Sequence, residues 1–300
     1  MNANTMKEIP LVFDCLGDDL IGIVHKPEVP SEIGVLTIVA GGPQYRAGVG
    51  RGMVSLARSL ASRGVAVMRF DYRGLGDSSG AFLGYDQMAE DLQAAVNAFR
   101  EAVPEVKKVV LWGGCDAASG AMIHGWKVTG VQSLVLGNPW VSTEEIRSAV
   151  LRKHYTKRLG EAQFWKKLVR FEYNLFDYAA AGIKKVTRRI ARVFSSGARP
   201  GATAAGGNAG DNPGRPIDRM LAGLRQFEGP VLFLMSGRSL VSNEFDELIK
   251  GSPAWQAVYK RPSCRRLDLP DADQTFSDGD SRARVNQAIL DWVTELQKGQ

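Results

Sequence analysis

The chain has 300 residues, of which 44% are hydrophobic and 23% charged, and its formal net charge is +6. These ordinary globular values exclude a mainly disordered, collagen-like or fibrous protein. The charge is local, because residues 152–199 hold thirteen Lys and Arg against three acidic residues, about +10, which leaves about −4 for the rest. Such a local excess is weak evidence for nucleic-acid binding by the whole fold, and we expect no nucleic-acid partner.

The N-terminus and the cysteines predict a cytoplasmic protein. Residues 1–10 lack the basic and apolar runs of a secretory signal, and no stretch approaches the ~18 apolar residues of a spanning helix. The three cysteines, Cys15, Cys115 and Cys264, are odd in number and irregularly spaced, which argues against disulfides and structural zinc. We expect no metal and no cofactor.

Short β-branched runs alternate with helical patterns in the first half of the chain. The predicted strands are Leu11–Cys15, Leu20–His25, Val35–Ala40, Val65–Tyr72, Val106–Trp112 and Val131–Gly137. The predicted helices are Met53–Arg63, Tyr85–Val103 and Asp116–Trp126. The first two strands read as a hairpin, and the later alternation predicts βαβ units with a mostly parallel sheet.

The alternation stops after Trp140 and resumes near residue 230. Ser142–Arg192 reads as helical, basic and aromatic, and Ser195–Pro216 as a flexible linker. The later predicted strands are Pro230–Ser236 and Arg265–Leu269, with helices at Asn243–Lys250 and Arg282–Leu296. We therefore predict an α/β core in two parts, residues 1–141 and 226–300, around an inserted basic helical lid with its linker at 142–225.

The most specific local signal lies after the Val106–Trp112 strand. Gly113-Gly114-Cys115-Asp116-Ala117 has the small-x-nucleophile-x-small pattern of a strained strand–turn–helix elbow, with Cys115 as nucleophile. A helix N-terminus favours an anion, so we expect a lowered thiol pKa and a thiolate. The alternative is a buried cysteine at a tight turn.

Two glycine-containing loops accompany the elbow. In Asp71-Tyr72-Arg73-Gly74-Leu75-Gly76-Asp77, the glycines permit a sharp turn, and Asp71 and Arg73 can hold it with charge-assisted bonds. A nucleotide loop is disfavoured by the spacing. After the Val35–Ala40 strand, Gly42 together with Asp116 would supply the two N–H groups of an oxyanion hole, because Pro43 cannot donate; the alternative is an ordinary Gly-Pro turn.

These motifs together resemble the α/β-hydrolase superfamily. More narrowly, the Cys115 elbow followed by Asp-Ala-Ala-Ser and the Gly-Gly-Pro-Gln loop resemble the exosortase A system-associated hydrolase 1 family. The resemblance covers roughly residues 10–145 and 225–297. It implies an α/β-hydrolase fold, a helical lid, and a link to exosortase and exopolysaccharide gene clusters in bacteria.

The sequence departs from the superfamily at two of three triad positions. The histidine would stand at Gln274, which cannot relay a proton, and the acid would stand at Ser239. Of the three histidines, we place His25 at the far side of the sheet, His124 about 13 Å along the helix from Cys115, and His154 on the insertion. Asp271, Asp273 and Asp278 crowd the Gln274 loop, and we expect turn chemistry from them.

Two functions follow, and the sequence leaves both open. The first is hydrolase or acyl-transfer chemistry on a small-molecule ester, thioester or lipid-linked substrate, with Cys115 attacking and Gln274 only positioning. The second is a catalytically silent binding protein. For the basic amphipathic segment 183–194 three roles compete: contact with an anionic membrane surface at the inner face, attraction of an acidic substrate or partner, or a solvated lid face.

Overall fold

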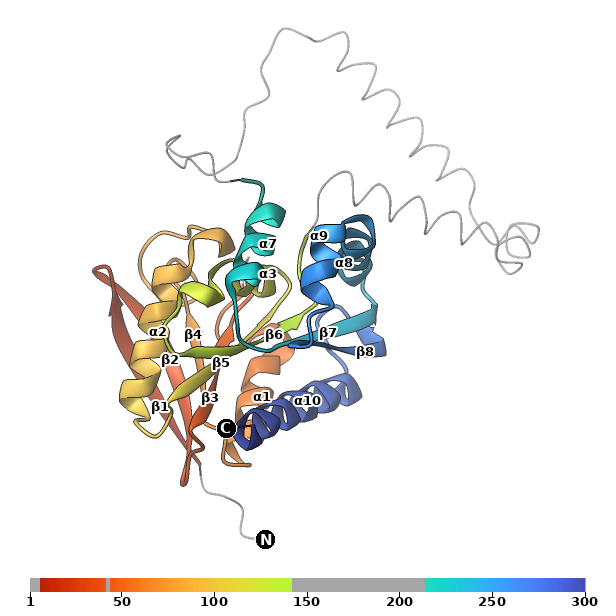
Figure 1. The fold of residues 1–300 in the computed structure, drawn as a ribbon. Coiled ribbons are helices and arrows are strands. Elements are labelled where there is room, and N and C mark those ends of the chain that lie inside the picture. The colour runs from red at the N-terminus through yellow and green to blue at the C-terminus, as the bar shows by residue number, and fades with distance from the viewer. Residues whose placement is uncertain (1–5, 42–43, 142–213, 300) are drawn as a thin grey trace, which may run out of the picture. The chain divides into compact units, whose positions relative to one another are not determined.

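The described residues form an eight-stranded sheet with helices packed against it (Figure 1). The computed structural model describes residues 6–41, 44–141 and 214–299. The strands are β1 Met6–Cys15, β2 Asp18–Pro27, β3 Ile33–Ile38, β4 Val67–Asp71, β5 Lys108–Gly114, β6 Val131–Gly137, β7 Val231–Arg238 and β8 Cys264–Asp273. Their order across the sheet is β1-β2-β4-β3-β5-β6-β7-β8.

The first two strands form the predicted hairpin, and it runs opposite to the rest of the sheet. β2 pairs antiparallel with β1 and with β4, whereas every pairing from β4 to β8 is parallel. Parallel strands need long crossovers, and the helices supply these connections. The carboxyl ends of β3 to β8 therefore lie at one edge, where the motif loops follow them.

Helices cover both faces of the sheet. They are α1 Gly52–Ala61, α2 Ala89–Ala102, α3 Asp116–His124, α7 Pro216–Gln226, α8 Leu240–Gly251, α9 Pro253–Tyr259 and α10 Gly279–Lys298, with 3₁₀ turns at Val49–Arg51, Tyr85–Gln87 and Gly125–Lys127. In Figure 1, α1 and α10 lie on one face, and α2, α3, α7, α8 and α9 on the other.

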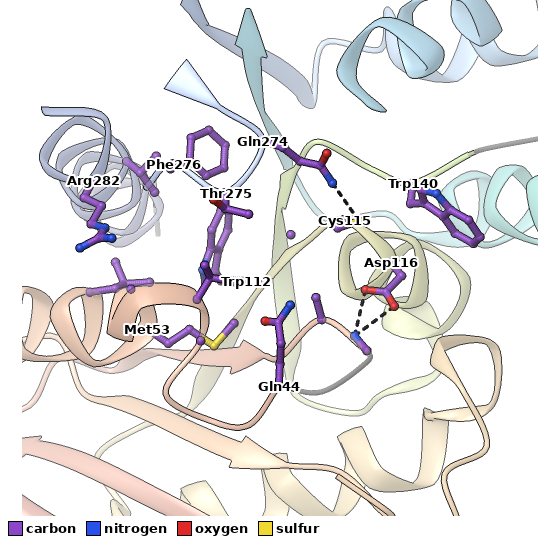
Figure 2. A pocket seen from close by; sticks show the side chains of 18 of the residues that line it. Gln44, Met53, Trp112, Cys115, Asp116, Trp140, Gln274, Thr275, Phe276 and Arg282 are labelled. Carbon is purple, nitrogen blue, oxygen red and sulfur yellow. Dashed lines mark hydrogen bonds between the residues drawn. The ribbon is translucent and has the colours of Figure 1, made fainter. Parts of the chain in front are cut away.

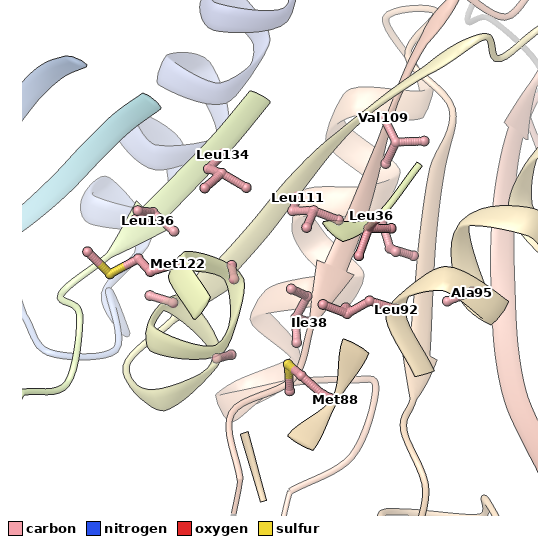
Figure 3. Close-up of a cluster of buried hydrophobic side chains, with 14 of the residues drawn as sticks. Leu36, Ile38, Met88, Leu92, Ala95, Val109, Leu111, Met122, Leu134 and Leu136 are labelled. Atoms are coloured by element: carbon pink, nitrogen blue, oxygen red, sulfur yellow. The ribbon is translucent and has the colours of Figure 1, made fainter. Parts of the chain in front are cut away.

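The alternation of side chains along the central strands produces two apolar clusters. On β3, Leu36 and Ile38 point toward α2, whereas Ile33 and Val35 point toward α1 and α10. Figure 3 shows the first cluster, in which residues of β3, β5 and β6 meet Met88, Leu92 and Met122. Because β3 is buried along its whole length, its residues are apolar or glycine except for buried Thr37.

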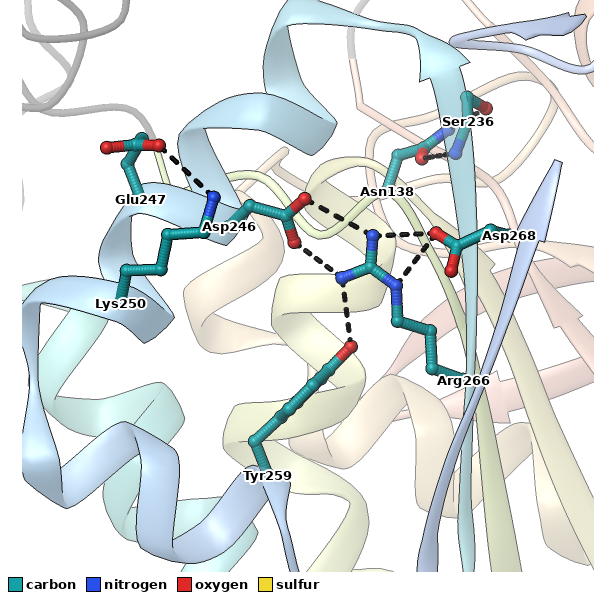
Figure 4. A network of polar contacts seen from close by, with 8 residues as sticks. All are labelled: Asn138, Ser236, Asp246, Glu247, Lys250, Tyr259, Arg266 and Asp268. Atoms are coloured by element: carbon teal, nitrogen blue, oxygen red, sulfur yellow. Dashed lines mark hydrogen bonds and ion pairs between the residues drawn. The ribbon is translucent and has the colours of Figure 1, made fainter. Parts of the chain in front are cut away.

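Polar contacts hold the last strands against the helices beside them. The Arg266 guanidinium on β8 donates to Asp246 of α8, to Asp268 and to the Tyr259 hydroxyl of α9 (Figure 4). These bonds are charge-assisted and join elements distant in sequence. They fix the β7–β8 end of the sheet, which carries two of the predicted site positions.

Helix α7 lies within the range 142–225 that we assigned to the insertion. Its Met220 and Leu224 are buried in the cluster that also contains Met122 of α3. The remainder of the predicted lid, including His154 and the 183–194 segment, lies outside the described residues, and its domain assignment stays a prediction. In the part of the chain that the structure describes, no helix has the length and apolarity to cross a bilayer.

Candidate active site

Cys115 stands alone between strand β5 and helix α3, in a strained backbone conformation. Its φ and ψ are 57° and −125°, a region that L-residues rarely adopt outside functional turns. A Cβ at Gly113 would lie 2.8 Å from the carbonyl carbon of Ala117, so the helix can approach the strand only if residue 113 is glycine. The local geometry is that of a nucleophile elbow.

Gln274 faces the thiol. Its Nε2 donates a hydrogen bond to Cys115 Sγ at 3.5 Å (Figure 2). The structure thus brings together Cys115 and Gln274, the residues at the predicted nucleophile and histidine positions, which are 159 residues apart in the chain. An amide can donate to sulfur and position a ligand, but it cannot accept a proton at neutral pH.

The thiol is not the thiolate that the sequence led us to expect. Burial raises the pKa of Cys115, and the Asp116 carboxylate raises it further. The Asp116 N–H and the Gln274 amide oppose this shift, but burial outweighs them. The expectation of a lowered pKa considered the helix N-terminus alone and was wrong, because desolvation of the anion is the larger effect.

The Gln274 loop is held by a buried amide that the sequence analysis missed. Asn138 Nδ2, just after β6, donates to the Gln274 carbonyl at 2.9 Å and to Ser236 Oγ at 2.7 Å. The Ser236 N–H donates to Asn138 Oδ1, and Ser236 Oγ donates to the Asp273 carbonyl (Figure 4 shows the Asn138–Ser236 pair). Asn138 and Ser236 therefore set the backbone from which Gln274 reaches Cys115.

A signal for Asn138 exists in the sequence. It follows a strand at a carboxyl end, and asparagine tolerates the positive φ of 45° that it adopts here better than most residues. Its partners, however, lie about a hundred residues further along the chain, beyond the reach of local patterns.

Ser239 takes a structural role at the predicted acid position. It is buried directly after β7, and its hydroxyl accepts a hydrogen bond from the Ser242 N–H, which caps α8. A serine has no carboxylate to orient a base. Its assignment to the triad position stays a prediction.

The Asp116 side chain crosses from the elbow to the loop after β3. Both of its carboxylate oxygens accept the Gly41 N–H, at 3.1 and 3.0 Å (Figure 2). Burial raises the pKa of this carboxyl. The Asp116 N–H lies beside the Cys115 thiol, whose anion it favours, whereas Gly42, the other predicted oxyanion donor, lies outside the described residues.

The Asp71–Asp77 turn is held by charged partners from elsewhere in the chain. Buried Asp71 accepts from the Arg46 N–H and guanidinium, and Arg73 forms a forked pair with Asp91, whose closest contact is 2.9 Å. Gly74 and Gly76 have φ of 73° and 55°. A Cβ at Gly76 would overlap the Asp71 carboxylate, so both φ and space require glycine there.

Neither described histidine is placed to serve Cys115. His25 pairs with Val67 at the start of β4, the opposite end from the site, and its Nε2 accepts from Arg69. His124 is buried at the end of α3. Burial lowers the pKa of each to about 4, so both are neutral at pH 7.

The acidic residues near Gln274 serve the loop itself. Asp273 accepts from the Thr275 and Ser277 N–H groups, Asp278 caps α10, and exposed Asp271 lies 3.8 Å from Arg238. The described part of the chain holds no group of three or more His, Cys, Asp or Glu residues arranged to bind a metal.

A cavity of about 290 Å³ opens beside Cys115. Its described lining is largely apolar, with Met53, Leu56, Trp112, Phe276 and Val285 on the wall. Of the polar groups, Cys115, Asp116 and Gln274 lie at one side and Arg282 at the other (Figure 2), and Gln44, Thr275 and Asn286 complete the polar part of the described lining. A small apolar cavity with a few directed polar groups is typical of small-ligand sites.

Comparisons with known proteins agree with the fold. The family model "serine aminopeptidase, S33" matches residues 47–176. An esterase from Pyrococcus furiosus is similar in structure, with a TM-score of 0.60, 14% identity, and coverage of 97% of this chain and 91% of that one. A search of curated protein sequences finds no match.

Two further solved structures are similar. Est1E from Butyrivibrio proteoclasticus, with bound ferulic acid, has a TM-score of 0.59, 15% identity, and coverage of 97% and 100% of the two chains. A dienelactone hydrolase from Anabaena variabilis has a TM-score of 0.58, 13% identity, and coverage of 97% and 98%. At these identities the likeness establishes the fold.

Proposed function

From the α/β-hydrolase fold of this chain we infer that it acts on a small carboxylic ester or thioester and takes the acyl group on Cys115. The observation that carries the proposal is the position of the Cys115 thiol. It stands on a strained elbow, 3.5 Å from the Gln274 amide, at the wall of an apolar cavity. Strain of this kind persists where the surroundings maintain it, and it concentrates at functional sites.

The acylation step needs no cofactor. Cys115 Sγ attacks the acyl carbon, the carbonyl electron pair moves to oxygen, and the alcohol or thiol leaves with the proton that the thiol loses. The Asp116 N–H faces the developing oxyanion, with Gly42 as the second donor of this proposal. Because the described residues place no base beside Sγ, this proton travels through water, which takes a proton from the thiol and gives one to the leaving alcohol or thiol.

Deacylation is the slower half of the reaction. Water must attack the thioester without a general base, a loss that typically costs ~10²–10⁴ in rate. Gln274 can position this water but cannot deprotonate it. An acyl group on Cys115 should therefore accumulate, and activated esters and thioesters should be better donors than alkyl esters.

A silent binding protein is the second candidate, and a specific observation favours it. The thiol pKa is raised, and the residue that contacts the thiol at the predicted position of the base is an amide. Under this alternative the cavity binds its ligand without forming a bond. Reactivity of Cys115 therefore separates the two functions.

The wider setting comes from the sequence alone. The link to exosortase and exopolysaccharide processes is proposed from the family resemblance, and peripheral contact with an anionic membrane from the basic segment at 183–194. A liposome-flotation assay with and without anionic lipid tests the second point. Equal binding in both cases, or none, excludes it.

Intact-mass spectrometry tests the acyl proposal. The protein is incubated at pH 8.5 with p-nitrophenyl acetate and with an acyl thioester. We expect one stable acetyl or acyl adduct, absent from Cys115→Ala and retained in Cys264→Ala. Cys264 is the matched control, because it is half-buried whereas Cys15 is buried with a pKa raised to about 11. Without an adduct or turnover the binding function replaces the enzyme.

A further inference from the structure

The far wall of the cavity carries a cation that the proposed chemistry does not use. Arg282 lines the same cavity as Cys115, and Figure 2 shows the two on opposite sides of Trp112 and Thr275. Within residues 6–41, 44–141 and 214–299, no carboxylate lies within 4 Å of its guanidinium, and no acceptor is found for it. The cavity thus presents five N–H donors without acceptors on a mainly apolar wall.

The place of Arg282 in its helix argues against a purely structural role. It is the fourth residue of α10, where the positive end of the helix dipole disfavours a cation. Asp278 caps the start of the helix, and its carboxylate accepts a hydrogen bond from the Ser281 N–H. In the described helix neither Asp278 nor Asp280, the acidic residues at its start, forms an ion pair with Arg282.

The guanidinium is nevertheless held against the cavity wall. A Cβ at Gly50 would lie 2.8 Å from Arg282 Nη2, so the guanidinium lies against the backbone at Gly50. Gly48, Gly52 and Arg282 all line the cavity. Contact with backbone restricts the long side chain and reduces the entropy that ligand binding would cost.

The two charged residues of the described lining make one side of the cavity negative and the other positive. Asp116, beside the thiol, is engaged with Gly41 and repels an anion, whereas Arg282 attracts one. A ligand with a carboxylate at one end and an ester at the other would therefore place its carboxylate at Arg282. Its acyl carbon would then lie toward Cys115.

We propose that the cavity takes monoesters or monothioesters of short dicarboxylic acids, and that Arg282 is the residue that determines this specificity. The guanidinium binds the free carboxylate with two parallel hydrogen bonds. The apolar wall of Met53, Trp112 and Val285 contacts the methylene chain. The acylation of Cys115 by such an ester rests on the proposed function. The binding of the carboxylate at Arg282 does not.

Two probes of equal chain length test the preference. Mono-p-nitrophenyl adipate and p-nitrophenyl hexanoate differ only in the terminal carboxylate. We expect the wild-type protein to be acylated at least about tenfold faster by the adipate ester, since a hydrogen-bonded charged group contributes about that factor or more. Arg282→Gln should remove the preference, and Arg282→Lys should keep part of it. Equal rates for the two probes in the wild-type protein overturn the inference.

Arg284→Gln is the matched control. Arg284 lies on the same helix with the same charge, is exposed, and does not line the cavity. It should retain the preference, and an equal loss in both variants would assign the effect to general surface charge. Thermal melting of each variant establishes that it is folded.

A binding measurement separates this inference from the proposed function. Monomethyl adipate is titrated into Cys115→Ala and into Cys115→Ala with Arg282→Gln, and binding is followed by NMR. Binding that the second variant loses supports the inference even if no ester acylates the protein. Absent or equal binding in the two overturns it, whatever the fate of the acyl step.

Discussion

Replacing Asp116 with Asn removes one charge beside the thiol and nearly nothing else. The Asn side chain has the same shape, and its oxygen can still accept the Gly41 N–H that the carboxylate accepts now. After burial, the charge of this carboxylate is the second cause of the raised thiol pKa. Its removal should therefore lower the thiol pKa, and each unit of that fall corresponds to about 1.4 kcal/mol.

The measurement is the rate of Cys115 alkylation by iodoacetamide across pH 6–10. The Cys264→Ala background leaves Cys115 as the reactive thiol, since Cys15 is buried with a pKa raised to about 11. A fall of one unit raises the thiolate fraction at pH 7 about tenfold, and the rate rises in proportion, less the lower nucleophilicity of a more acidic thiol.

Asp271→Asn is the control for this experiment. Asp271 is an exposed carboxylate on the Gln274 loop, and its removal should leave the profile in place. If Asp116→Asn leaves the alkylation profile where the wild-type profile lies, or moves it to higher pH, the electrostatic account of the site is wrong. The same shift in Asp271→Asn would show that the effect is not specific to the elbow.

Asp116→Asn should also change how the free energy of unfolding depends on pH. Burial raises the pKa of this carboxyl from its ordinary value of 3.8, so the folded state holds the proton more tightly than the unfolded state. The contribution of this tighter proton binding to the free energy of unfolding is complete below pH 3.8. It is lost as the pH rises through the raised pKa of the folded state. Asn does not ionise, so its stability relative to the wild type should increase over that window and then stay constant to neutral pH, as urea denaturation would show.

Three further predictions follow from the site and its supports. Gln274→His should place a base beside Cys115 and raise steady-state ester hydrolysis by up to about 10²-fold, more with Ser239→Asp, which keeps the cap on α8; unchanged turnover in both would mean that residue 274 is not the base position. Asn138→Ala leaves the buried polar groups of Ser236 and Gln274 without partners and should lower the free energy of unfolding by about 2–4 kcal/mol, with less than about 1 kcal/mol contradicting its role. Burial lowers the pKa of His124 from 6.5 to about 4, so the folded state keeps the neutral form, and stability falls by about 3 kcal/mol as the pH drops from above 6.5 to about 4. His124→Leu should flatten this pH dependence in urea titrations at pH 7, 5.5 and 4.5, and an unchanged slope would contradict it.

The sequence predicts the strands and most helices because burial and turn chemistry are local signals. Short, mainly apolar runs mark β3 to β6, and glycine requirements mark the turn at Gly76 and the elbow at Gly113. Helix α9 escapes prediction because seven residues are too few to show a helical period. Helix α7 escapes as a separate element because it begins directly after a Gly- and Pro-rich stretch.

The candidate site is predicted in its positions but not in its electrostatics. The opposition of Gln274 and Cys115 follows from the superfamily topology that the motifs indicate. The thiol pKa does not follow, because it depends on how deeply Sγ is buried and on where the Asp116 carboxylate points. The Asn138 network and the placement of Arg282 depend on contacts across the fold that no local pattern contains.

The strain at Cys115 bears on whether the site still works. A non-glycine residue at φ 57° and ψ −125° costs of order 1–3 kcal/mol, which a chain that needs only its fold could relieve. Here the conformation is maintained by Gly113, by the close approach of α3, and by the contact with Gln274. The described surroundings thus stabilise the position of Sγ, and none of the described residues places a proton acceptor for the thiol beside it. A site of this kind is suited to holding a ligand or acyl group on sulfur for a long time, and less to releasing it quickly.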